Sequence, residues 1–182
     1  TQQGWVDPTL SESADAVVEM AREWHDGRPA KEKVEFARRF AAQPWVARRD
    51  TLWRREAYLK FAQRNFLDAG MLADNLDRLA KADRNGYVWI DLSQALRSRG
   101  RAVEALATAD RAIAFALEKK NANLEADGRL VRAEAQHSLN RFDEAKETYR
   151  AIAVKDLYGP YRERYRKFGG TLKMPASEIQ KP

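Results

Sequence analysis

Side chains that commonly carry catalysis or bind metals are scarce in this chain. The sequence contains no cysteine and two histidines, His25 and His137, which stand more than a hundred residues apart. The run Trp24-His25-Asp26 offers two donors, but a metal site needs three or four donors that converge on the ion. We therefore expect no metal site, and we expect His25 to be an ordinary polar residue at the end of a helix.

Motifs for phosphate binding or nucleophilic catalysis are also absent from the sequence. It has no glycine-rich phosphate loop, no nucleophile elbow and no His-Glu metalloprotease motif. The many carboxylates are spaced like ordinary helix-surface partners, three or four residues from a base. We expect a protein that is not an enzyme and that has no cofactor.

Basic and aromatic residues together point to a second class of function. The net charge is +6 and the isoelectric point about 9.6, which favours acidic partners at long range. Arg48-Arg49, Arg54-Arg55 and residues 161–168 interleave basic and aromatic side chains as RNA-binding surfaces do. Acidic residues are mixed into most of these stretches, as on any soluble helical surface. Nucleic-acid binding is therefore the alternative function.

The elements that position these residues are expected to be helices almost throughout. Ala, Leu, Arg, Glu and Lys dominate, whereas the strand-favouring Val, Ile and Thr are few. Apolar residues recur at helical spacing, and Gly, Pro and Asn mark the breaks. The pattern predicts helices at about 10–24, 30–42, 50–63, 66–81, 86–98, 102–119, 123–138, 142–153 and 158–168.

A small residue recurs in a similar phrase along the middle of the chain. Ala69, Ala105 and Ala145 end the phrases RNFLDA, GRAVEA and NRFDEA, at spacings of 36 and 40 residues. A period of this length indicates stacked helical hairpins, because one hairpin cannot bury its apolar face alone.

These residues resemble the tetratricopeptide repeat (TPR) family, whose 34-residue pattern places large and small residues at set positions of two helices. The second of three units matches best, and the third lacks the Trp and Leu of its first helix. Its extra residues, around 119–127, imply a longer helix or a loop. The matching positions are Trp53, Ala57, Phe66, Ala69, Ala73 and Leu76; Trp89, Leu92, Ser93, Leu96, Gly100, Ala105, Ala109 and Ala112; and Ala133, Gln136, Phe142, Ala145, Tyr149 and Ile152.

The resemblance implies an all-α fold, a right-handed superhelical array of antiparallel helix hairpins, or TPR-like α-solenoid. We expect a degenerate N-terminal hairpin at 1–49 and three TPR-like repeats within 50–154, at about 50–85, 86–122 and 123–154. A C-terminal capping helix at 155–170 and a tail or linker at 171–182 would follow.

In such arrays the first helices of successive units line a concave groove, so the resemblance implies a scaffold that binds a peptide or protein segment there. Aromatic and aliphatic side chains would anchor the segment, and polar ones would orient it. The family's groove positions that we assign to binding are Arg54, Tyr58, Phe61, Tyr87, Ile90, Gln94, Arg97, Leu130, Glu134 and His137. Packing between hairpins is an equally good explanation of Tyr58, Phe61 and Ile90.

Two family activities can be compared at specific positions. Chaperone-binding TPRs hold a C-terminal carboxylate, but Asp91 and Asp127 occupy two of the corresponding positions and would repel it. Trp53, Tyr58 and Phe61 also resemble the aromatic spacing of half-a-TPR repeats in RNA-processing proteins, which belongs to the nucleic-acid alternative.

Other expectations concern assembly and location. Trp5, Trp24 and Trp45 could form an apolar end through which the chain self-associates, although capping the core internally explains them as well. No run of about 18 apolar residues occurs, so we expect no membrane span. The chain opens on Thr1 without a leader, which favours a fragment or mature form of a bacterial envelope or secretion protein, with a cytoplasmic protein as the alternative.

Overall fold

The computed structural model describes residues 14–64, 66–82 and 85–179, and over these ranges the chain is all-helical, without strands, as predicted. It divides into two compact units, Thr1–Leu79 and Ala80–Pro182, called unit 1 and unit 2 below. The division falls inside the helix Ala69–Ala82, close to the predicted end of the first repeat at residue 85. The predicted start of the first helix, at Leu10, lies outside the described residues, as does Trp5.

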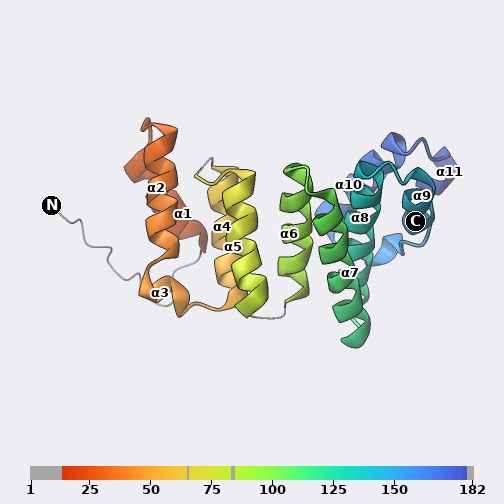
Figure 1. The fold of residues 1–182 in the computed structure, drawn as a ribbon, viewed down its shortest axis with the longest axis horizontal. Helices are drawn as coiled ribbons and strands as arrows, with labels where there is room; N and C mark the ends of the chain where they lie inside the picture. The colour runs from red at the N-terminus through yellow and green to blue at the C-terminus, as the bar shows by residue number, and fades with distance from the viewer. Residues whose placement is uncertain (1–13, 65, 83–84, 180–182) are drawn as a thin grey trace. The chain divides into compact units, whose positions relative to one another are not determined.

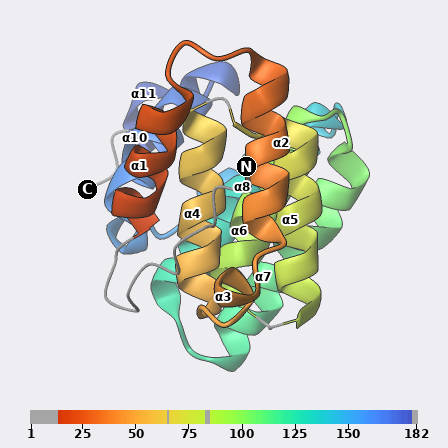
Figure 2. The same ribbon diagram turned by 90° about the vertical axis from the view of Figure 1, so that its left-hand side faces the viewer.

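Unit 1 consists of helices that gather around aromatic side chains. Helix α1 packs beside α4, as Figure 2 shows. Phe36 and Phe40 of α2 contact Phe61 of α4 with ring centroids 6.1 and 4.8 Å apart. The helices are α1 (Ala14–His25), α2 (Ala30–Ala41), α3 (Pro44–Ala47), α4 (Thr51–Gln63) and α5 (Ala69–Ala82).

Trp45 belongs to this aromatic core, which bears on the expectation of self-association. Its side chain is 6% exposed and packs edge-on against Phe40 and Trp53, at 5.5 and 6.0 Å. The guanidinium of Arg49 lies over the Trp53 ring at 4.8 Å, in a cation–π contact. Trp45 therefore caps the core internally, while the side chain of Trp24 lies outside the described residues.

Unit 2 is a series of antiparallel helices in which alternate helices also meet. Helix α7 packs against α6 and α8, and α8 packs in addition against α6, α9 and α10 (Figure 1). The elements are α6 (Gly86–Ser98), α7 (Ala102–Glu118), α8 (Ala122–Ser138), α9 (Phe142–Arg150), the 3-10 turn η1 (Val154–Asp156), α10 (Gly159–Thr171) and α11 (Ala176–Ile179).

Small residues allow the helices of unit 2 to approach closely. Ala105 of α7 and Ala145 of α9 are fully buried, whereas Ala69 in unit 1 is half-buried. The hydroxyl of Ser93 donates to the carbonyl of Ala105 at 2.8 Å, which joins α6 to α7. Helices α7 and α8, which flank the turn at 119–121, have 17 residues each, so the extra residues expected around 119–127 are accommodated by longer helices and not by a long loop.

Two predicted turn residues end their helices in the left-handed conformation. Gly100 has φ +74° and Asn140 has φ +60°. In both cases the amide of this residue and the amide of the next one bond back into the helix: the Gly100 amide donates to the carbonyl of Arg97 at 2.9 Å and the Arg101 amide to that of Leu96 at 3.0 Å. This pattern satisfies carbonyls that the helix leaves free. Asn65, the third predicted turn residue, lies outside the described residues.

Three segments differ from the expectation. Pro44 was expected to end a helix, but α2 ends at Ala41 and Pro44 begins α3, because the first turn of a helix tolerates proline. Gly169 and Gly170 do not stop the last long helix, which continues to Thr171. A Cβ at Gly169 would clash with the Tyr149 hydroxyl, so glycine serves close packing there rather than termination.

The segment expected to be a tail or linker is partly folded onto unit 2. Leu172 and Met174 are buried in the same core cluster as Tyr149, and α11 follows them. Arg150 donates to Glu178 of α11 at 2.8 Å. Residues 171–179 therefore pack on unit 2.

Candidate functional site

The candidate site is the face of unit 2 on which α6, α8 and α10 come together. These are the first helices of successive hairpins, and α8 lies between the other two. Asn85 starts α6 by accepting from the amide of Tyr87 at 3.0 Å, and Asn121 starts α8 by accepting from the amide of Leu124 at 3.0 Å. We call this surface the α6/α8/α10 face.

Arg164 of α10 connects all three helices. Its guanidinium donates to both carboxylate oxygens of Glu134 on α8, with Nε 2.6 Å from Oε1. It also donates to the side-chain oxygen of Gln94 on α6. The amide nitrogen of Gln94 in turn donates to the Tyr161 hydroxyl at 2.8 Å. Because a bidentate Arg–carboxylate pair is strong and directional, it fixes the spacing of these helices.

Burial and charge shift the pKa values of this network. Burial alone would lower the pKa of Arg164, but its hydrogen bonds to Glu134 and the charges of Glu134, Tyr161 and Asp91 together outweigh burial and raise the pKa. Burial, together with the charge of Asp91, raises the pKa of Tyr161. Both groups therefore keep their protons, and Arg164 keeps its charge, throughout the physiological range.

Asp127 of α8 lies at the edge of the network and has a different environment. Its side chain is 2% exposed, and it accepts a hydrogen bond from the Tyr158 amide at 3.2 Å. Burial raises the pKa of Asp127 to about 6, and the Tyr158 bond offsets only part of that effect. It is thus a carboxylate whose charge changes just below neutral pH.

Several predicted binding residues meet on this face. Gln94 and Glu134 belong to the Arg164 network, and Arg97 lies beside them, with Nη2 3.5 Å from Glu134 Oε2. His137 packs edge-on between Phe142 and Phe168, at 5.2 and 5.7 Å between ring centroids.

Other predicted anchors are in the core. Ile90 and Leu130 in unit 2 and Phe61 in unit 1 are at most 1% exposed. We therefore assign these three to packing and do not carry them forward as ligand contacts. Tyr87, at the start of α6, is 36% exposed and remains accessible.

Arg54 and Tyr58 lie in unit 1, on α4. Tyr58 is 6% exposed, and burial raises its pKa against the opposing charges of Arg54 and Arg78. The α6/α8/α10 face is described here for unit 2 alone, and these two residues are taken up separately below.

The sequence analysis overlooked Tyr161 and Arg164 as members of this face. It placed both in the basic and aromatic segment 161–168, which belongs to the nucleic-acid alternative. The two are three residues apart, so they are neighbours on a helix surface, and the Arg164 guanidinium lies 5.8 Å from the Tyr161 ring centroid. A long arginine at the margin of an apolar stripe was the available signal.

The chemistry of the face is that of hydrogen bonding and charge. Within residues 14–64, 66–82 and 85–179, no three His, Asp or Glu side chains are placed to hold a metal ion. Over the same described ranges, no helix is both long and apolar enough to cross a membrane. Comparison of the sequence with known protein families, with curated proteins and with solved structures gives no match in any of the three.

Proposed function

We propose that the chain is a non-catalytic scaffold of TPR-like helical hairpins, arranged as a right-handed superhelical array, that binds a segment of a protein partner. The observation that carries the proposal is the packing of α8 along both α6 and α10, with polar side chains of all three helices in contact. Hairpins that stack in one direction bring their first helices side by side in this way, and repeat proteins use such surfaces for binding.

The side chains of the α6/α8/α10 face differ in how far they are exposed to solvent. The hydrogen-bonding groups of Gln94 and Glu134 are engaged with Arg164. Tyr87 is exposed, Arg97 keeps 33% of its side chain exposed, and His137 is half-buried. An exposed tyrosine and an arginine are typical anchors of protein interfaces. We therefore narrow the expected contacts in unit 2 to Tyr87, Arg97 and His137.

Nucleic-acid binding has less support. Of the aromatic residues in the segment 161–168, Tyr165 and Phe168 are 1% and 8% exposed, so they pack in the core and offer no face for base stacking. Tyr158 is 64% exposed and precedes the exposed Arg162 and Arg166. Tyr158, Arg162 and Arg166 are therefore the residues on which nucleic-acid binding would depend, and the experiment below must distinguish this alternative from protein binding.

Affinity capture with the full chain as bait tests the proposal. Tyr87→Ala with Arg97→Gln should lose a protein that the unchanged chain retains. A matched control, Leu117→Ala with Arg111→Gln on α7, removes one exposed apolar and one exposed basic side chain elsewhere and should retain it. Equal retention by both variants, or retention of nucleic acid alone with a steep salt dependence, would contradict the proposal.

A further inference from the structure

Five arginines of unit 1 form ion pairs with three glutamates of α1 and α2, which are Glu19, Glu32 and Glu35. For example, Arg39 donates to Glu35 at 2.9 Å and Arg64 to Glu19 at 2.5 Å. The five are Arg22, Arg28, Arg38, Arg39 and Arg64.

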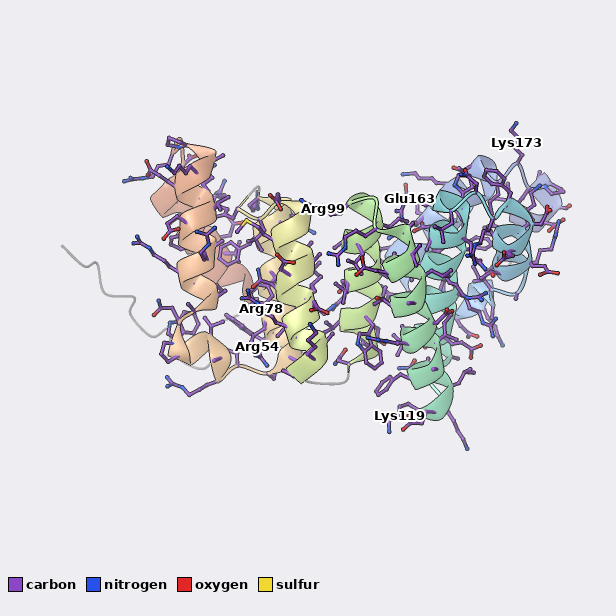
Figure 3. All side chains as sticks on the ribbon, in the orientation of Figure 1. Arg54, Arg78, Arg99, Lys119, Glu163 and Lys173 are labelled. Atoms are coloured by element: carbon purple, nitrogen blue, oxygen red, sulfur yellow. The ribbon has the colours of Figure 1, made fainter. Side chains whose placement is uncertain are left out.

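Arg54 on α4 and Arg78 on α5 differ from this group. Neither forms an ion pair with any residue that the structure describes, and Figure 3 labels both side chains. The Nε atom of Arg54 is buried and has no hydrogen-bond acceptor among the described residues. A buried N–H without an acceptor is costly, and no described residue offsets that cost at Arg54.

Both charges bear on Tyr58. Arg54 precedes Tyr58 by four residues, so the two side chains are neighbours on the surface of α4. The charges of Arg54 and of Arg78 on α5 both lower the pKa of Tyr58 against the effect of burial. The Tyr58 ring is buried, and its hydroxyl forms no hydrogen bond with a described residue. Unit 1 thus has two guanidinium groups without an ion-pair partner among the described residues, and both affect the same tyrosine hydroxyl.

Donors of this kind match a carboxylate. Guanidinium groups bind planar carboxylates through paired N–H donors, and a tyrosine hydroxyl adds a further donor. A nucleic-acid strand would need several such contacts along its phosphates. A single side-chain carboxylate needs only the arginine pair.

We propose that Arg54, Arg78 and the Tyr58 hydroxyl form an anion site that takes a side-chain carboxylate from an acidic segment of the partner protein. This inference rests on the proposed scaffold function and names the chemistry of the partner. It adds Arg78, which lies on the second helix of its hairpin, to the binding residues, and it gives Arg54 and Tyr58 a defined role.

The test is a fluorescence-anisotropy titration of the full chain with dye-labelled hexaglutamate that has a blocked C-terminus. Hexaglutamine with the same dye serves as the uncharged probe. Arg54→Gln with Arg78→Gln should weaken hexaglutamate binding at least ~10-fold, and Tyr58→Phe about five-fold, because one neutral donor is lost. The control Arg38→Gln with Arg39→Gln removes the same charge from arginines that are paired with Glu35, and it should stay within about two-fold.

Each outcome decides the inference. Equal weakening by the two double variants would show that net charge alone attracts hexaglutamate, and failure of the unchanged chain to bind it would exclude the site. Binding of a thymidine 20-mer that depends on Arg54 and Arg78 in place of hexaglutamate would assign the site to phosphates. If the double variant loses helicity by circular dichroism, Arg78→Gln alone, at an exposed position, should still weaken binding. Partner capture that depends on Tyr87 and Arg97 but not on Arg54 or Arg78 would leave the scaffold proposal standing and refute the anion site.

Discussion

Replacing Asp127 with asparagine should stabilise unit 2 at neutral pH and leave it nearly unchanged in acid. Burial raises the pKa of this carboxyl from 3.8 to about 6 in the folded chain. A raised folded pKa means that the native state binds the proton more tightly than the unfolded state. The stability contributed by this proton is therefore complete below about pH 4 and is lost as the pH rises through about 6.

The size of the effect follows from that difference in pKa. At about 1.4 kcal/mol per pH unit, the charged form of Asp127 costs about 3 kcal/mol above pH 7. Asparagine removes the charge, and its side-chain oxygen can still accept from the Tyr158 amide. The variant should thus gain up to about 3 kcal/mol in free energy of unfolding at pH 7.5 and much less at pH 4.5.

Urea denaturation followed by circular dichroism at pH 4.5, 5.5, 6.5 and 7.5 measures this gain. The control is Asp143→Asn, an equal loss of charge at an exposed position of α9 in the same unit, with an expected change of about 0.5 kcal/mol or less. A gain for Asp127→Asn that is the same at all four pH values, or equal to that of the control, would refute the argument from burial.

Two further predictions concern packing in unit 2. Glu134→Ala should lower the free energy of unfolding by about 3–5 kcal/mol, because Arg164 loses its buried partner. A double-mutant cycle with Arg164→Ala should show that the two substitutions are coupled, and additive effects would argue against the bidentate pair. Gly169→Ala should lower the free energy of unfolding by about 1–3 kcal/mol, because its Cβ would clash with Tyr149. Gly170→Ala has open space around its Cβ and should be neutral or slightly stabilising. Equal thermal stability of the two variants would contradict the close approach of Gly169 to Tyr149.

Helix positions followed well from the sequence, because they depend on local patterns. The helix expected at 86–98 is Gly86–Ser98, and that expected at 102–119 is Ala102–Glu118. The cap at Asn85 and the left-handed Gly100 act within a few residues, so their chemistry is visible in the sequence itself. The short helix Pro44–Ala47 was missed, since proline signals both an end and a beginning.

The site was predicted only in part, because helical periodicity does not tell a groove from a core. The resemblance to TPR proteins assigned Ile90 and Leu130 to a groove, but both are buried, and burial depends on the neighbouring helix. The role of Arg164 depends on Gln94 and Glu134, which lie 70 and 30 residues away in sequence. No local sequence pattern predicts such a long-range contact. The absence of an acidic partner for Arg78 is likewise a property of the folded chain.

The same separations set an order of assembly during synthesis. Helices α6 to α9 meet their neighbours through short turns, so they can pack as soon as they leave the ribosome. The bonds from Arg164 to Glu134 and Gln94 close loops of 30 and 70 residues and must wait for α10. Until then the carboxylate of Glu134 lacks the bidentate Arg164 pair and has only the longer contact with Arg97, at 3.5 Å. A chain that stops before residue 159 would therefore expose the α6/α8/α10 face to chaperones and to other nascent chains, and docking of α10 is the step that ends this exposure.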